Sequence, residues 1–266
     1  MRQHEDPPAE IFHLAHPGHA LKLVTPTAGA AAATFVCDGC KEPGDGPRYT
    51  CGCGSARFDL HPPCALADED NGLRHPILGG CSFIFLPAPL PPVEKTICDA
   101  CGEPARGFVY HCFEDDLDLH PCCARLPERI LEGGRVFELR RKTSRPCGLC
   151  GGGSRRRSSF WAYRSCFDGE AVDLHVACMK DMARLSREAA ACKSRAAGGG
   201  AQIVQASLPD MDRVLQSLPA NKRKRSGFDK FVRIVSTVAS IIIAVIFGNP
   251  VAMIAAIAGP GGFLRG

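Results

Sequence analysis

The chain of 266 residues lacks several features that would place it in a familiar class. Its first residues carry charges and prolines where a secretory signal needs an apolar stretch of about 7–15 residues, so we expect no export to an oxidising compartment. A formal net charge of +4 is too small to indicate a polyanionic partner by itself. Neither a glycine-rich phosphate loop nor a paired carboxylate motif is present to support an enzyme.

Cysteine, in contrast, is abundant, with 16 residues in the chain. Thiols in a reducing compartment stay reduced. Closely spaced cysteine and histidine residues are therefore better explained as metal ligands than as disulfide partners.

One cysteine and histidine pattern occurs three times along the chain. Each copy has a C-x-x-C, then a tyrosine shortly before another cysteine, then a hydrophobic residue followed by Asp-Leu-His-x-x-Cys. The loop between the two ends differs in length, whereas the spacing within each end is fixed. The predicted ligand sets are Cys37, Cys40, His61 and Cys64 in the first copy, Cys98, Cys101, His120 and Cys123 in the second, and Cys147, Cys150, His175 and Cys178 in the third.

Three thiolates and one imidazole in this arrangement are typical of a structural zinc site. The C-x-x-C turn supplies one edge of a tetrahedron and the H-x-x-C supplies the opposite edge. Soft ligands select Zn²⁺ over Mg²⁺ and Ca²⁺, and a full set of four leaves no open position for catalysis. Buried thiols with core histidines, or redox use of the C-x-x-C pairs, are the alternatives, and repetition in the same order disfavours both.

Two further features of the repeats concern residues beside the ligands. Cys123 aligns with the cysteine that is always present, so Cys122 occupies a place held elsewhere by Pro63 or Ala177. The aspartates before the histidines, which are Asp59, Asp118 and Asp173, are expected either to accept a ligand N–H or to lie in solvent on the strand face.

Four segments of the first copy carry a family resemblance, and these are HALKL (19–23), CDGCKEP (37–43), RYTC (48–51) and FDLHPPCA (58–65). Together they resemble the divergent C-one domain, the plant Cys/His-rich relative of the phorbol-ester and diacylglycerol-binding zinc finger. The similarity extends over residues 13–180. It implies a small β-rich module with a short helix after the H-x-x-C and two interleaved zinc sites.

The resemblance also implies a second ligand set, made from a leading histidine, a second cysteine pair and a trailing ligand. Its candidates in the first copy are His19 (or His16), Cys51, Cys53 and His75, although His75 could instead open the second copy. The later copies lack a full set, so we expect three to four Zn²⁺ per chain. The Gln-Gly pair of lipid-binding fingers is absent between the ligands, which leaves diacylglycerol binding unsupported.

Other zinc-finger activities find less support in the sequence. A ubiquitin-ligase cross-brace needs another C-x-x-C soon after the H-x-x-C, and none follows Cys64, Cys123 or Cys178. Nucleic acid could contact the three arginines at 155–157 near Trp161, but a solvated basic loop is the preferred interpretation.

The C-terminal third has a different composition. A helix rich in Ala, Leu, Met, Arg and Glu is expected after Cys178, and a polar, basic linker with NKRKR at 221–225 follows it. The uncharged stretch 234–247 would span about 21 Å as a helix, short of a bilayer core of about 30 Å, whereas continuation to Ala258 through a kink would suffice. Basic residues before this stretch favour a membrane anchor or hairpin, and packing on the zinc modules is the alternative.

The predicted fold class is therefore small zinc-stabilised β-rich modules (α+β, irregular), three in tandem, followed by helical and apolar C-terminal segments. The predicted segments are module one (13–75), module two (76–132), module three with a trailing helix (133–192), a basic linker (193–230) and an apolar tail (231–266). We expect a non-enzymatic, zinc-binding interaction or signalling adaptor with protein partners and membrane association through residues 231–258. It would be cytoplasmic, the alternatives being a nuclear nucleic-acid-associated protein or a Cys/His enzyme.

Overall fold

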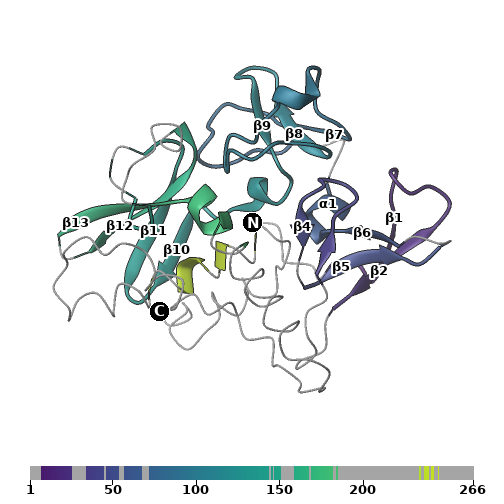
Figure 1. Cartoon of the computed structure of the whole chain (residues 1–266), viewed down its shortest axis with the longest axis horizontal. Helices are drawn as coiled ribbons and strands as arrows, with labels where there is room; N and C mark the ends of the chain where they lie inside the picture. The colour runs from purple at the N-terminus through teal and green to yellow at the C-terminus, as the bar shows by residue number, and fades with distance from the viewer. Residues whose placement is uncertain are drawn as a thin grey trace, which may run out of the picture.

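The computed structural model describes three small modules and a few residues of the tail (Figure 1). The described residues are 7–25, 34–44, 46–53, 57–67, 72–143, 145, 147–150, 159–167, 169–181 and 184, and in the tail 234, 237–239, 241, 242 and 245. The predicted linker 193–230 and Cys192 lie outside them.

Each module is built on an antiparallel sheet. Module one orders its strands β1(Glu10–Phe12), β2(Ala20–Val24), β5(Arg48–Cys51) and β6(Phe58–Leu60), and adds the pair β3(Phe35–Val36) and β4(Pro43–Gly44) and the helix α1(Pro62–Ala65). Module two has β7(Ile84–Leu86), β8(Val109–Cys112) and β9(Leu117–Leu119), with 3₁₀ turns η1(Val93–Lys95) and η2(Cys123–Arg125). Module three has β10(Arg129–Glu132), β11(Arg135–Arg140), β12(Ala162–Phe167) and β13(Glu170–His175), and residues 176–181 are helical. Three tandem, β-rich Cys/His modules are thus confirmed.

The sheet of module three begins at Arg129, inside the segment that the sequence assigns to module two. The reason is a hairpin in which Glu132 pairs with Arg135 across Gly133 and Gly134. Both glycines have positive φ, 56° and 72°, which the tight hairpin turn needs and which glycine adopts without steric cost.

A buried tyrosine holds the start of a module against its sheet. The Tyr49 hydroxyl donates to the carbonyl of Pro8 at 2.6 Å, and the Tyr163 hydroxyl donates to the carbonyl of Pro127 at the same distance. The tyrosines of modules one and three therefore each bond to the chain at the start of their module.

Neighbouring modules dock through a repeated backbone hydrogen bond. Phe108 N–H donates to the carbonyl of Gly39 at 3.0 Å, and Trp161 N–H donates to the carbonyl of Ala100 at 3.1 Å. Both acceptors are the third residue of a C-x-x-C, and both donors stand two residues before the repeat tyrosine. Modules two and three thus use the same position of the repeat to contact the C-x-x-C turn of the module before them.

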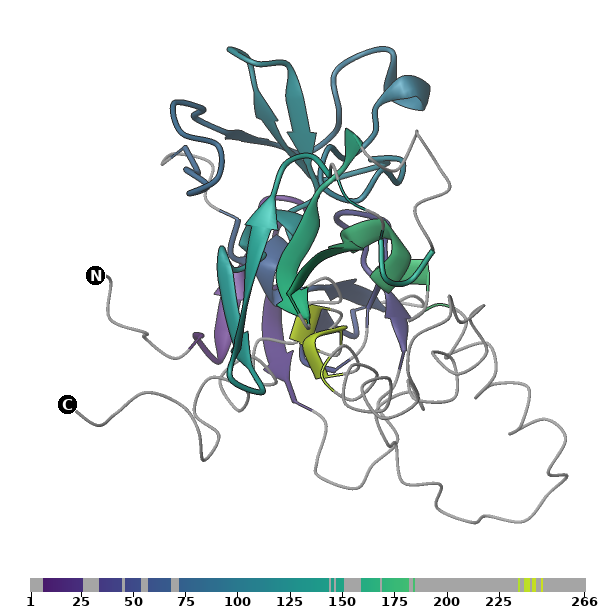
Figure 2. The ribbon, with the colours of Figure 1, turned by 90° about the vertical axis from the view of Figure 1, so that its left-hand side faces the viewer.

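The described tail residues are helical and lie in the hydrophobic core. Ile234, Val238, Ile241, Ile242 and Val245 are all buried, and their spacing places them on one helix face. Ile234 lies against the Gly133 turn. The described tail residues, drawn in yellow, lie beside β10 in Figure 1 and close to the strands in Figure 2. Among the residues described, no helix combines the length and apolar composition needed to span a bilayer.

Candidate metal centres

A tight turn presents the two thiols of the C-x-x-C in modules one and two. In module one, Lys41 N–H donates to the Cys37 carbonyl at 2.9 Å and Cys37 N–H donates to the Glu42 carbonyl at 3.0 Å. In module two, the corresponding bonds of Gly102 and Cys98 measure 2.7 and 2.9 Å. Lys41 and Gly102 both have positive φ, which reverses the chain directly after the second thiol.

The other two ligand positions come from the end of a strand and the turn that follows it. His61 follows β6, and Cys64 lies on α1, which begins at Pro62 with the φ that proline favours at a helix start. The carbonyl of His61 accepts bonds from Cys64 N–H and Ala65 N–H at 2.9 and 2.8 Å. One helical turn therefore places the imidazole and the thiol on the same side.

The structure brings together the four residues of each predicted set. The donor atoms within a set all lie within 4.8 Å of one another, in the clusters that we name the first (Cys37, Cys40, His61, Cys64), second (Cys98, Cys101, His120, Cys123) and third centres (Cys147, Cys150, His175, Cys178). Every one of these residues is buried except Cys150.

Distances within the centres fit a tetrahedral metal. The His61 Nδ1 atom lies 3.4 Å from Cys40 Sγ and 3.8 Å from Cys64 Sγ. The corresponding distances are 3.5 and 4.0 Å at His120, and 3.6 and 3.5 Å at His175. Zn–S and Zn–N bonds of about 2.3 and 2.0 Å give a tetrahedral S–N edge of about 3.5 Å, so the donors are spaced as Zn²⁺ requires.

Hydrogen bonds fix the orientation of the histidine rings. Nε2 of His61 lies 3.2 Å from the Pro43 carbonyl, and Nε2 of His120 lies 3.2 Å from the Pro104 carbonyl. A carbonyl only accepts, so these rings carry their proton on Nε2 and keep the Nδ1 lone pair for a metal. In the third centre, Thr143 Oγ1 takes the same place, 3.4 Å from His175 Nε2.

The expectation for the three aspartates is corrected by these contacts. Each pairs with a cation or ring on the neighbouring strand: Asp59 with Arg48 Nε at 3.2 Å, Asp118 with His111 Nδ1 at 3.0 Å, and Asp173 with Arg164 Nε at 2.7 Å. Asp118 and Asp173 are paired in register with the residues that they contact, whereas Asp59 is paired with Thr50 and reaches Arg48 diagonally. The groups that accept the histidine ring N–H are instead the carbonyls of Pro43 and Pro104. The Glu-Pro that follows the C-x-x-C in modules one and two was the sequence signal for them.

In each centre, the surroundings favour ionisation of one cysteine although that thiol is buried. Burial opposes ionisation of Cys37 and Cys101, yet thiol hydrogen bonds within the cluster hold both pKa values well below the usual value. A hydrogen bond from Cys178 lowers the pKa of Cys147 to about 3. Packed thiolates away from water are costly without a cation, which agrees with a metal as the missing partner.

A fourth group in module one contains His16, Cys51 and Cys53, all half-buried. His16 Nε2 lies 2.9 Å from Cys53 Sγ. The ring of His19 lies 5.3 Å from that of His16 but contributes no atom to the group. His75 lies elsewhere, with Nε2 bonded to the Leu126 carbonyl at 3.1 Å, and burial lowers its pKa.

Module two has a related group that the repeat comparison missed. The Cys81 thiol donates to Asp115 Oδ2 at 3.1 Å, and the Cys112 thiol donates to Glu114 Oε2 at 3.1 Å. Burial, together with Asp115 and Cys112, raises the pKa of Cys81 to about 12, so this thiol keeps its proton. The position of Cys81 before β7 matches that of His19 before β2, which was the available sequence signal.

A buried lysine joins all three modules at the second centre. Lys180, from the helical residues of module three, has Nζ 2.5 Å from Glu42 Oε2 in module one and 3.5 Å from Cys101 Sγ in module two. Burial opposes its charge, but Cys101, Cys123 and Glu42 together raise the pKa of Lys180 well above its usual value. The ammonium group therefore offsets the negative charge of the centre.

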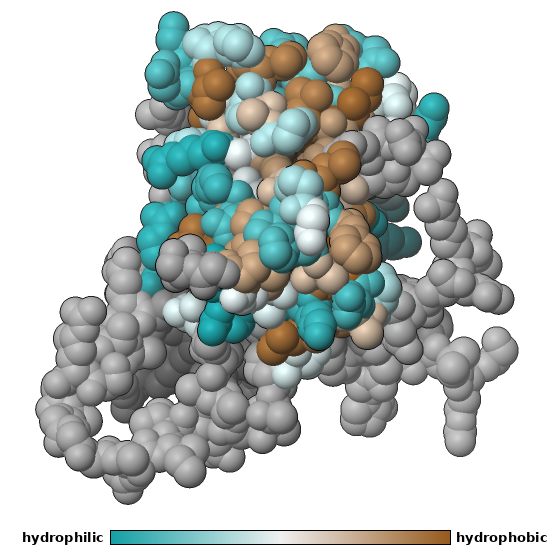
Figure 3. Space-filling view, turned by 90° about the vertical axis from the view of Figure 1, so that its right-hand side faces the viewer, coloured by the Kyte–Doolittle hydropathy of each residue, from teal (hydrophilic) through white to brown (hydrophobic). Residues whose placement is uncertain are grey.

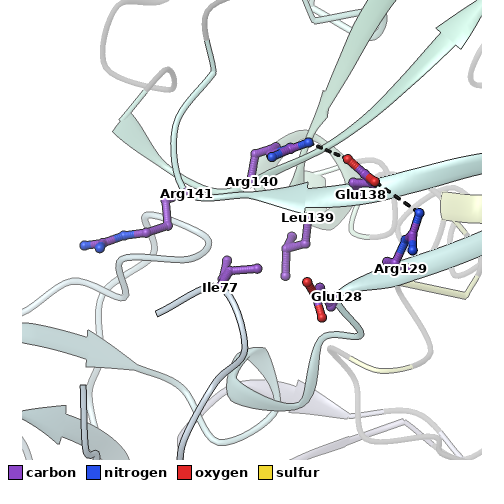
Figure 4. Close-up of a pocket in the computed structure, with 7 residues that line it drawn as sticks. All are labelled: Ile77, Glu128, Arg129, Glu138, Leu139, Arg140 and Arg141. Carbon is purple, nitrogen blue, oxygen red and sulfur yellow. Dashed lines mark hydrogen bonds and ion pairs between the residues drawn. The ribbon is translucent and has the colours of Figure 1, made fainter. Parts of the chain in front are cut away.

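A cavity of about 440 Å³ lies away from these centres (Figure 4). It is lined by Ile77, Glu128, Arg129, Glu138, Leu139, Arg140 and Arg141, none of which belongs to a centre. Glu138 pairs with both Arg129 and Arg140, and Figure 4 shows it between them. Glu138 therefore offsets part of the positive charge of the arginines that line the cavity.

Comparison with known proteins bears on the first module. Residues 15–65 match the family model of the C1 domain. No curated protein and no solved structure shows significant similarity to the chain. The matched segment contains every residue of the first centre and of the group formed by His16, Cys51 and Cys53. The first module is thus a C1-like zinc finger, and the three buried Cys₃His centres are compatible with Zn²⁺.

Proposed function

We propose that this protein is a non-enzymatic adaptor whose zinc-stabilised modules present loops to protein partners. Zinc at each centre would cross-link a C-x-x-C turn to the end of a distant strand. Such binding is worth about 10–16 kcal/mol in zinc-finger peptides, enough to stabilise modules that are too small for a large core. With four protein donors per centre, no coordination position is left for a substrate.

The observation that carries the interaction role is an exposed apolar turn in module one. Phe12 and Leu14 are 78% and 73% exposed, whereas His13 between them stacks on Phe108 of module two at 5.5 Å. The turn is therefore held in place while its two large apolar side chains face outward. On the face drawn in Figure 3, hydrophobic residues are interspersed with hydrophilic ones.

Proximity labelling in cells tests this role. We expect the double substitution Phe12→Ser and Leu14→Ser to remove specific partners while the zinc content stays unchanged. Phe113→Ser, which alters another exposed aromatic residue at 60% exposure, serves as the matched control. If the unmodified chain, the double variant and Phe113→Ser label the same proteins, the proposed binding surface is contradicted.

The enzyme alternative has a separate test. A Cys/His enzyme needs an ionised, unligated cysteine beside a free histidine. No cysteine of the native, zinc-loaded chain should therefore be alkylated faster than an ordinary exposed thiol such as Cys166, which belongs to none of the centres. One rapidly modified cysteine would revive the enzyme hypothesis.

For the tail we propose cytoplasmic membrane association that requires its release. The buried positions of Ile234, Val238 and Ile242 are occupied by packing within the protein, so they reach lipid only if the helix leaves its site. Flotation of the full chain and of a 231–266 deletion with anionic vesicles measures this. Equal recovery of both chains with the vesicles would contradict tail-mediated association.

A further inference from the structure

A second cavity, of about 250 Å³, lies where the three modules meet. Its walls come from the loop after the C-x-x-C of module one, from the equivalent loop of module two and from the helical residues of module three. The charged residues that line it are Lys41, Glu42, Glu103, Arg106, Lys180 and Arg184. The walls therefore carry more positive than negative charge.

Both carboxylates of this cavity are already paired with cations of module three. Lys180 and Arg184 are one helical turn apart, so they lie on the same helix face. Lys180 Nζ lies 2.5 Å from Glu42 Oε2. Arg184 Nη2 lies 3.1 Å from Glu103 Oε1. The helix thus neutralises one glutamate of each loop, and Lys41 and Arg106 are the cations that remain.

These two remaining cations have no counterion in the part of the chain that the structure describes. Lys41 Nζ donates to the carbonyl of Asp38, which is a neutral group. No described carboxylate forms an ion pair with Lys41 or with Arg106. The two residues also approach each other across the contact of modules one and two, because a Cβ on Gly107 would lie 3.2 Å from Lys41 Cγ. An anion between them would remove the repulsion of two like charges.

The size and charge of the cavity select the kind of anion. Pockets for drug-sized ligands measure about 300–1,000 Å³, so this smaller cavity suits one compact group. A phosphate monoester carries about −1.5 to −2 charges at pH 7, which matches two free cations better than a carboxylate does. A guanidinium can bind two phosphate oxygens at once, and an ammonium adds a point charge. We propose that Lys41 and Arg106 bind the phosphate group of a phosphate monoester in this cavity, where it bridges modules one and two.

Calorimetric titration of the zinc-loaded, full-length chain with glycerol 3-phosphate tests the proposal. We expect a single site, and much weaker binding of acetate, which has only one charge. Arg106→Gln and Lys41→Gln should each weaken binding roughly 10–100-fold, the loss expected when one hydrogen bond between charged groups is removed. Neither residue belongs to a metal centre, so the zinc content should not change.

Matched controls remove the same charges elsewhere in module one. Arg57 and Lys22 are exposed and do not line the cavity. Arg57→Gln and Lys22→Gln should therefore bind glycerol 3-phosphate as the unmodified chain does. The proposal is overturned if Arg106→Gln binds as tightly as Arg57→Gln, if acetate binds as well as glycerol 3-phosphate, or if the unmodified chain binds neither.

Vesicles that contain phosphatidic acid present the same group on a lipid and so distinguish its source. Recovery with these vesicles that falls in Arg106→Gln but not in Arg57→Gln would assign the site to a lipid headgroup. Binding of glycerol 3-phosphate without such a fall would assign it to a free phosphate monoester. Either result supports the site, whereas titrations in which all four variants equal the unmodified chain would refute it.

Discussion

Lys180→Met should uncouple the three modules while leaving every metal ligand in place. The substitution keeps the apolar stem of the side chain and removes the ammonium group, which is 2% exposed between Glu42 and Cys101. Removing one partner of a buried ion pair costs about 3–5 kcal/mol, because the remaining charge is left unpaired. Since Glu42 is 19% exposed and can be partly solvated, we expect the loss of stability to lie near the lower limit of this range.

The chain contains its own fluorescent reporter for this measurement. Its single tryptophan, Trp161, is buried where module three bonds to Ala100 of module two, and its ring lies 4.8 Å from that of His75. Urea titration of the zinc-loaded chain, followed by Trp161 emission and by zinc release, should show that Lys180→Met exposes Trp161 at lower denaturant. We also expect the second centre to bind zinc about 10–100-fold more weakly, as when other groups beside metal ligands are removed.

Arg184→Met provides the control from four residues further along the chain. Arg184 is half-exposed and pairs with Glu103 at 3.1 Å, so its loss should cost less than about 1 kcal/mol. The pKa of Lys180 is raised on folding, so its contribution is fully present below the unfolded value near 10.5 and is lost only as pH rises through the folded pKa. A Lys180→Met chain within about 1 kcal/mol of Arg184→Met at pH 7 would refute the coupling role.

Three other outcomes are expected. Elemental analysis should find three tightly held zinc ions and a weaker fourth that Cys53→Ala removes, and an unchanged count in that variant would exclude the fourth group as a site. Gly39→Ala should cost about 1–3 kcal/mol through the clash with Phe108, measured as a lower urea midpoint, whereas Gly79→Ala meets no atom within 4 Å and should be nearly neutral. Ile242→Asp should release the tail at a cost of at least about 2 kcal/mol, seen as faster tryptic cleavage before it, and unchanged cleavage would contradict its packing.

The ligand clusters were predictable because a metal site requires ligands at short, fixed spacings in the sequence. Spacing within C-x-x-C and H-x-x-C is fixed by a single turn, and three copies make the pattern distinct from chance. The strand before each histidine was predictable from its alternation of apolar and polar residues. Both features depend on residues close together in the chain.

Contacts between modules were not predictable, because they depend on how separate units meet. Nothing in the sequence around Lys180 shows that Glu42 lies beside it in the structure. The position of His75 stayed open for the same reason, since its partner Leu126 is far away in the sequence. The early start of the third sheet also depends on pairing across Gly133 and Gly134, which the segment boundaries overlooked.

The repeated docking bond also determines how the array ends. A head-to-tail contact of this kind adds units without closing, and on exposed surfaces it would let separate chains polymerise into filaments. The place held by Phe108 and Trp161 is taken in module one by Pro47, whose ring nitrogen carries no hydrogen to donate. At the other end, the residue equivalent to Gly39 and Ala100 is Leu149, which is bulkier and already buried. Because Pro47 has no N–H to donate, module one cannot make this bond to the C-x-x-C turn of another chain, so the head-to-tail contact does not extend beyond module one.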